Sequence, residues 1–230
     1  MRIDRRFRGP PNSGNGGYIA GLLARELGGF DSVVTLRMPP PLDCELRIEH
    51  DTPETCSLVS DDGVVALAVR ATVEIAIPAP PSFPDARAAE ARFAGLCDHN
   101  FPGCFVCGPE RAAGDGLRIF PGALDGSAQV AATWTPDASL ADANGRLPSE
   151  FIWAALDCTG YFAVQQQAGL AVLGRIGATL HHDVALGAHV IVSGWPIASD
   201  GRKHRVGTAL HDRGGRLLAA AEATWISLQR

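Results

Sequence analysis

The chain has 230 residues, of which 46% are hydrophobic, so it can form one large domain or two small ones with real cores. Its formal net charge of -5 makes it a poor candidate for non-specific binding to nucleic acid or to an anionic membrane. It contains no run of about 18 apolar residues that would predict a membrane span, and six cysteines are too few for a disulfide-built fold.

The N-terminal stretch MRIDRRFRGPPNSGNGG is charged and lacks the apolar core of a secretory signal. We therefore expect a cytoplasmic protein whose cysteines are reduced thiols. The stretch SGNGGYIAGLLARELGG places large apolar residues at helical spacing, and Gly28-Gly29 would end this helix. Four strand-like runs follow, namely SVVTLRM, CELRIEH, TCSLVSDD and VVALAVRATVEIA.

A proline-rich break separates two halves of the chain. The prolines at positions 78, 80, 81 and 84 would stop the preceding strand, and the Ala/Arg/Glu run after them favours a short helix. We interpret residues 78–99 as a linker. The predicted units on either side of it are residues 1–77 and 100–230.

The second half repeats the order of the first. SAQVAATW is expected as a strand and PSEFIWAALDCTGYFAV as a helix, and four more strands follow in LGRIGATLHHDV, GAHVIVSGW, KHRVGTAL and RLLAAAEATWISL. Gly63 aligns with Gly215 and Ala71-Thr72 with Ala223-Thr224, at one constant offset. One helix followed by an antiparallel meander, twice, predicts an α+β fold. Because both helices are apolar almost all round, we expect two antiparallel sheets, each wrapped around a long central helix and joined into one continuous sheet.

Three stretches resemble the hotdog-fold acyl-CoA thioesterases. CFVCGPERAAGDGLRIF resembles the opening strand of that family, SEFIWAALDCTGYFA resembles its central helix with an acidic residue two turns in, and NSGNGGYIAGLLA resembles its helix start. The family usually has His-Gly-Gly where this chain has Asn15-Gly16-Gly17. The tandem copies resemble a double hotdog.

The resemblance implies hydrolysis of an acyl thioester of coenzyme A or of acyl carrier protein. It implies no cofactor beyond the coenzyme A of the substrate, no nucleic-acid or membrane partner, and it allows a homodimer of double-hotdog chains. These remain expectations, because a fold does not determine a function.

Asp157 is the only charge in FIWAALDCTGYFA. No residue three or four positions away on its helix is Lys or Arg, so it has no ion-pair partner there. A buried, unpaired carboxylate is costly and its pKa is raised, which makes Asp157 a candidate nucleophile or general base. The structural alternative is an aspartate that bonds backbone groups or Thr159.

The start of the first helix is the second candidate. Backbone N–H groups at a helix start have no intrahelical partner, so those at Asn15, Gly16 and Gly17 could stabilise an oxyanion. The structural alternative is a capped helix start, with Ser13 or Asn15 as the N-cap.

The two helices have complementary parts. Asp157 lies as far beyond Ser149 as Ala24 lies beyond Gly16, so the first helix has the glycines without the acid and the second has the acid without the glycines. We therefore predict one composite site per chain, with Asp157 opposite the start of the first helix.

Substrate-binding residues are expected around this site. Aromatic side chains would exclude water, and the basic run GRKHR would bind the phosphates of coenzyme A, unless it is only a solvated hairpin turn. The expected residues are Asn12, Tyr18, Trp153, Tyr161, Arg175, Arg202, Lys203 and Arg205.

Four residues have spacing that resembles a zinc site: Cys97, His99, Cys104 and Cys107. Only one Cys-x-x-Cys pair is present, so we expect no metal there. Cys158 follows Asp157 but points elsewhere on a helix, and a Cys/His nucleophile is disfavoured.

Two alternatives to thioester hydrolysis remain. A non-catalytic acyl-CoA or lipid-binding module would keep the pocket without needing the acid. A hotdog hydratase or dehydratase would use an Asp and a His four residues apart at the helix start, and we find no such pair near these helices.

Overall fold

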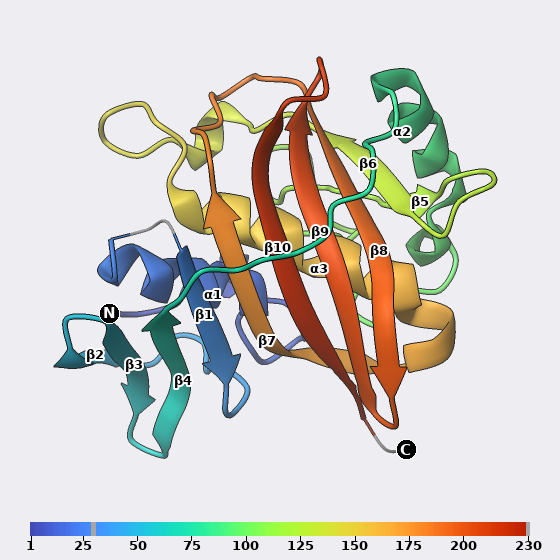
Figure 1. Cartoon of the computed structure of the whole chain (residues 1–230). Coiled ribbons are helices and arrows are strands. Elements are labelled where there is room, and N and C mark those ends of the chain that lie inside the picture. The colour runs from blue at the N-terminus through green and yellow to red at the C-terminus, as the bar shows by residue number, and fades with distance from the viewer. Residues whose placement is uncertain (29–30, 229–230) are drawn as a thin grey trace.

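A computed structural model describes residues 1–28 and 31–228, and these residues form one antiparallel sheet of ten strands. The strand order is β2-β3-β4-β1-β7-β10-β9-β8-β6-β5. Figure 1 shows the sheet in front, with helices α1 and α3 behind it. The predicted α+β class is confirmed.

The elements of the first half precede those of the second along both the chain and the sheet. The first half contains α1 (Gly16–Glu26), β1 (Asp31–Leu36), β2 (Arg47–Thr52), β3 (Thr55–Ser60) and β4 (Gly63–Arg70). The connection contains α2 (Phe83–Ala89) and short 3-10 turns at Glu90–Arg92 and Ala94–Leu96. The second half contains β5 (Gly122–Ala123), β6 (Val130–Trp134), α3 (Ser149–Ala168), β7 (Ala171–Leu180), β8 (Val190–Asp200), β9 (Lys203–Asp212) and β10 (Leu217–Ser227). Further 3-10 turns lie at Arg5–Phe7 and Ala138–Leu140.

The two halves share a strand order. β2-β3-β4-β1 in the first corresponds to β8-β9-β10-β7 in the second, and β1 pairs antiparallel with β7 where they meet. Gly63 and Gly215, which the sequence alignment pairs, have φ of +120° and +88° in equivalent turns. Glycine is favoured at both positions because other residues rarely adopt such angles.

The two helices differ in length more than the sequence predicted. α3 has 20 residues, whereas α1 has only 11, so the expectation of a long helix in each half is wrong for the first. α1 ends before Gly28, which adopts φ of +90° as expected for a residue past a helix end. Gly29, the second glycine of that predicted stop, lies outside the described residues.

The strand before the linker is shorter than predicted. β4 ends at Arg70, so the prolines from position 78 onward do not terminate it. The chain then crosses the outer face of the sheet as an extended segment, drawn in green in Figure 1. Val73 lies against β7 there, since a Cβ on Gly177 would come within 2.9 Å of its side chain.

Residues 104–120, predicted as an opening strand, instead form turns. The N–H of Gly108 donates to the carbonyl of Cys104 at 2.9 Å, which closes a tight turn. Isolated backbone bonds then join Leu117 to Phe105 and Ile119 to Val106. The turn curls the segment back on itself, and this prevents a regular strand.

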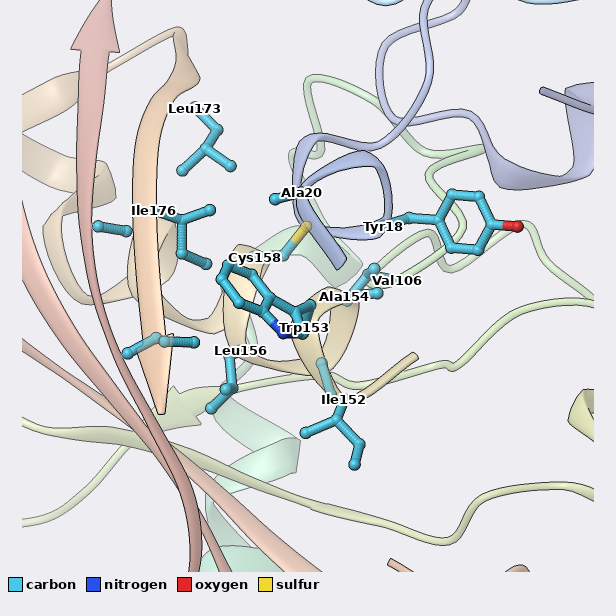
Figure 2. Packing of buried hydrophobic residues seen from close by; sticks show 14 of the residues in the cluster. Tyr18, Ala20, Val106, Ile152, Trp153, Ala154, Leu156, Cys158, Leu173 and Ile176 are labelled. Atoms are coloured by element: carbon cyan, nitrogen blue, oxygen red, sulfur yellow. The ribbon is translucent and has the colours of Figure 1, made fainter. Parts of the chain in front are cut away.

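α1 and α3 cross closely because α1 presents glycines to α3. A Cβ on Gly17 would lie 2.5 Å from Asp157 Cβ, and one on Gly21 would lie 2.5 Å from Glu150 Cα. Figure 2 shows Trp153 of α3 in this packed layer, with Leu173 and Ile176 of β7 to one side. The helix crossing therefore brings the start of α1 to the middle of α3.

Candidate active site

The start of α1 holds the Asp157 carboxylate. Asn15 is the N-cap of α1, and its side-chain oxygen accepts a hydrogen bond from the N–H of Tyr18 at 2.9 Å. Its side-chain nitrogen donates to Asp157 Oδ2 at 2.9 Å, and the N–H of Gly17 donates to the same oxygen at 3.0 Å. The acid of one helix and the glycine start of the other therefore lie together.

Burial is the main perturbation of the Asp157 carboxyl group. The side chain is 1% exposed, and burial raises its pKa to about 7. The two hydrogen bonds from Gly17 and Asn15 oppose this shift, while a charge on nearby Cys104 would add to it. Asp157 Oδ1 is buried and has no hydrogen-bond partner among the described residues.

Gly16 supplies the N–H group that remains open at this helix start. The N–H of Gly17 is used by Asp157, and that of Tyr18 by the Asn15 cap. Within residues 1–28 and 31–228 the Gly16 N–H has no acceptor. A Cβ at Gly16 would lie 2.8 Å from the Leu173 side chain and 2.9 Å from the Leu36 side chain. Glycine at this position therefore leaves room for a ligand to approach the Gly16 N–H.

A cavity of about 650 Å³ opens beside these groups. Of the predicted site residues, its wall includes Asn12, Asn15, Gly16, Asp157 and Tyr161. Most of the remaining wall is apolar and comes from segments distant in sequence, including Leu36, Met38, Phe101, Leu170, Leu173, Trp225, Ile226 and Leu228. Such a wall excludes water and suits an apolar ligand.

Comparison with solved structures identifies proteins of the same architecture. A TesB protein of Mycobacterium avium subsp. paratuberculosis matches with a TM-score of 0.60 and 14% identity over 96% of this chain and 89% of that one. A structure from Thermobifida fusca named as a thioesterase II has a TM-score of 0.61 and 14% identity, with 100% of this chain and 91% of that chain covered. A structure from Novosphingobium aromaticivorans named as a thioesterase has a TM-score of 0.61 and 12% identity, with 100% of this chain and 94% of that chain covered. The chain resembles hotdog-fold thioesterases. No family model and no curated protein matches its sequence.

Two predicted aromatic residues lie outside the cavity wall. Tyr18 stacks on Phe7, with ring centroids 4.2 Å apart, and Figure 2 shows it directed away from Cys158 and Leu173. Trp153 is fully buried in the core. Neither residue lines the cavity. Trp153 lies one turn before Asp157 on the same face of α3, where it packs against Gly21 of α1.

The predicted basic residues also lie outside the cavity wall. Arg175 is exposed on β7, and Arg205 on β9 forms an ion pair with Glu222 at 2.9 Å. Arg202 and Lys203 are exposed at the β8–β9 turn. This turn borders the cavity, since the carbonyl of Arg202 accepts from Ser227, between the wall residues Ile226 and Leu228.

Three cysteines meet at the cavity wall. The sulfurs of Cys104, Cys107 and Cys158 lie within 4.8 Å of one another, and all three side chains are buried. Cys97 and His99 of the zinc-like spacing are not part of this group. Sequence reasoning missed the cluster because Cys158 reaches it from a separate element, α3.

His99 and Arg37 also line the cavity and were not predicted to do so. His99 accepts a hydrogen bond from the N–H of Phe101 at its Nδ1, so its proton resides on Nε2, and burial lowers its pKa. Arg37 lies near the end of a predicted strand and His99 at the end of the predicted linker, and neither place indicates a cavity wall, so only the folded chain reveals their position. No helix in the described part of the chain is long and apolar enough to span a membrane.

Proposed function

We propose that this protein hydrolyses an acyl thioester, with acyl-CoA as the substrate, at one site between α1 and α3. The observation that carries the proposal is a buried carboxylate, held by the start of the opposite helix, beside an open backbone N–H and an apolar cavity. The fold of solved thioesterases supports this reaction class.

The mechanism uses three groups. The thioester carbonyl oxygen accepts a hydrogen bond from the Gly16 N–H, which stabilises the negative charge that develops on it. Asp157 Oδ1 removes a proton from a water molecule while the water oxygen attacks the carbonyl carbon. The carbon–sulfur bond then breaks, and the thiolate leaves and receives the proton from Asp157.

The pKa of Asp157 suits this role. General bases work best when their pKa is close to the working pH, and burial brings this one to about 7. Asn15 and Gly17 hold Oδ2, so the carboxylate keeps a fixed orientation and the unpartnered Oδ1 is left for the water.

We further infer that the chain is a double hotdog with units at residues 1–77 and 100–230. The shared strand order and the antiparallel β1–β7 junction support a pseudo-twofold relation between the units. The equivalent of the active site would lie where the start of α3 meets α1. Glu150 occupies that position and forms an ion pair with Arg25 at 2.6 Å, next to the buried Ala24. A single active site per chain follows.

Arg202 and Lys203 are proposed to bind the nucleotide end of coenzyme A. Both side chains are exposed beside the cavity edge, and neither forms an ion pair with a described residue. Phosphate groups are strong acceptors for such cations.

Replacing Arg202 and Lys203 by glutamine is expected to raise KM for acyl-CoA about fivefold or more, the equivalent of about 1 kcal/mol. KM for the matching acyl-pantetheine thioester, which lacks the nucleotide, should change little. Arg205→Gln is the control, because Arg205 belongs to the same basic run but is paired with Glu222. Equal effects on both substrates would refute the assignment.

The function itself is tested by measuring thiol release from a panel of acyl-CoAs of different chain length. Purified protein should release coenzyme A from at least one member at rates well above the uncatalysed reaction. Saturable binding of acyl-CoA without thiol release would instead identify a non-catalytic binding module. Hydration of an enoyl-CoA with the thioester intact would identify a hydratase, and either result would overturn the proposal.

A further inference from the structure

The cysteine cluster has no part in the proposed reaction, yet it contacts the residues that perform it. Cys104 Sγ and Cys158 Sγ lie 3.8 Å apart, and Cys107 completes the group. All three residues are buried and line the cavity, which is the route by which a small reagent would reach them.

A metal site is the less favoured reading of this cluster. Structural zinc sites use four protein ligands. Within the described ranges only three donors come within 4.8 Å of one another. Covalent chemistry between two of the thiols requires no fourth group.

The surroundings of Cys104 favour its thiolate form. The Cys107 and Cys158 sulfurs lie beside its sulfur, and contacts with them and with the backbone N–H groups of Cys107 and Val106 lower its pKa. The tight turn makes this arrangement possible, since any Cβ on Gly108 would lie 2.4 Å from the Cys104 carbonyl oxygen. The thiolate is the form of cysteine that attacks electrophiles.

Contacts with the sulfurs of Cys104 and Cys107, together with burial, raise the pKa of Cys158, so this residue remains a thiol beside the Cys104 sulfur. The pair therefore combines a nucleophilic sulfur with a nearby second thiol, which is the arrangement of redox-sensing cysteines.

We propose that Cys104 and Cys158 form a covalent modification site for hydroperoxides, with Cys104 as the attacking residue and Cys158 as the resolving one. The Cys104 thiolate attacks one oxygen of hydrogen peroxide, the O–O bond breaks, and Cys104 sulfenic acid and hydroxide form. The Cys158 thiol then loses its proton to hydroxide and attacks the sulfenic sulfur, which expels a second hydroxide. The proton that the Cys104 thiol released when it ionised converts this hydroxide to water. Overall, two thiols are oxidised to one disulfide and the peroxide is reduced to two waters.

The disulfide would disturb the active site. A disulfide bond is about 2.05 Å long, so the two sulfurs must approach from their separation of 3.8 Å. Cys158 follows Asp157 on α3, and the Asn15 side-chain nitrogen contacts both Asp157 Oδ2 and Cys158 Sγ, at 2.9 and 3.8 Å. Movement of Cys158 toward Cys104 would therefore strain the hydrogen bond from the Asn15 side-chain nitrogen to Asp157 Oδ2, which orients the carboxylate. This consequence rests on the proposed function, whereas formation of the disulfide does not.

The test is oxidation of the purified full-length protein with equimolar hydrogen peroxide, followed by alkylation and peptide mass spectrometry. We expect a Cys104–Cys158 disulfide, reversed by dithiothreitol. In Cys158→Ser the reaction should stop at Cys104 sulfenic acid, trapped as a dimedone adduct. Cys97→Ser, which removes an exposed thiol outside the cluster, should oxidise like the unmodified sequence.

Three results would overturn the proposal. These are oxidation confined to Cys97, a Cys104–Cys107 link in place of the Cys104–Cys158 link, and one zinc per chain that blocks oxidation and is lost in Cys158→Ser. Thiol release is measured on the same samples and should fall at least tenfold on oxidation and return on reduction. An unchanged rate in fully oxidised protein would refute the link to Asp157. A protein inactive in both states would refute the proposed function, while the mass spectrometry would still decide the modification site.

Discussion

Replacing Asp157 by asparagine is expected to lower turnover at least about a hundredfold while making the folded protein more stable at pH 8. An asparagine side chain can still accept both hydrogen bonds at Oδ2 through its oxygen. It cannot take a proton from water, so the rate falls. It also carries no charge, so the cost of burying an ionised group disappears.

The stability gain follows from the raised pKa. Because the folded protein binds the Asp157 proton more tightly than the unfolded chain does, stability present at low pH is lost as the pH rises through about 7. The shift from the ordinary 3.8 to about 7 corresponds to about 4 kcal/mol. The asparagine N–H₂ group would lie buried without a partner, at a cost of about 1–3 kcal/mol. A net gain of about 2 kcal/mol at pH 8 remains.

Urea unfolding of both proteins at pH 8 and pH 5 measures this difference. The advantage of the variant should shrink at pH 5, where the Asp157 carboxyl group is already protonated in the folded protein. In the unmodified protein, kcat/KM should rise with pH until about 7 and then level off. The titratable groups that share the cavity wall with Asp157 are the clustered thiols, His99 and Arg37. Full activity in the variant, or lower stability at pH 8, would refute the role given to this carboxylate.

A single methyl group at Gly17 is expected to cost about a hundredfold in kcat. The added Cβ would lie 2.5 Å from Asp157 Cβ and 2.8 Å from the Trp153 carbonyl oxygen, so α1 must move away from α3. The movement lengthens the hydrogen bond from the Gly17 N–H to Asp157 and displaces the Gly16 N–H from the carboxylate. Overpacking of this kind also destabilises a protein by about 1–3 kcal/mol.

Gly21→Ala is the matched control for Gly17→Ala. Its Cβ would lie 2.5 Å from Glu150 Cα, so it crowds the same pair of helices one turn farther from the active site. Both variants should unfold at lower urea concentration, but Gly21→Ala should keep kcat within about tenfold. Equal losses of kcat would show that helix separation in general, and not the contact with Asp157, determines the rate.

Periodicity and complementary motifs were enough to predict the α+β class and the meeting of Asp157 with the start of α1. A lone acid on an apolar helix and a glycine pair without an acid are local signals, and the pairing of two like halves brings them together. The different roles of the backbone N–H groups at the start of α1 could not be predicted. Only the folded geometry shows that Gly17 binds the carboxylate while Gly16 remains open.

The cavity wall was predicted less well, for a physical reason. Tyr18 and Trp153 are near the key residues in sequence, but Tyr18 stacks on Phe7 and Trp153 packs against Gly21, one turn of α3 away from Asp157. The wall instead comes from Leu36, the start of β7 and the end of β10, which meet only through long-range strand pairing. The three-thiol cluster escaped prediction likewise, since it joins a turn to the middle of α3.

Joining α1 and α3 in one polypeptide has a consequence for how the site responds to concentration. Along the chain, Asn15, Gly16 and Gly17 come before the extended segment that crosses the sheet, and Asp157 comes after it. Their encounter is therefore intramolecular, and its effective concentration is set by the tether and not by the amount of protein. Dilution cannot separate the two helices, so specific activity should be constant down to the lowest enzyme concentration that can be assayed. Each position at the helix crossing also occurs only once per chain. A substitution in α1 is therefore not repeated in α3, and it does not have to pack against a second copy of itself.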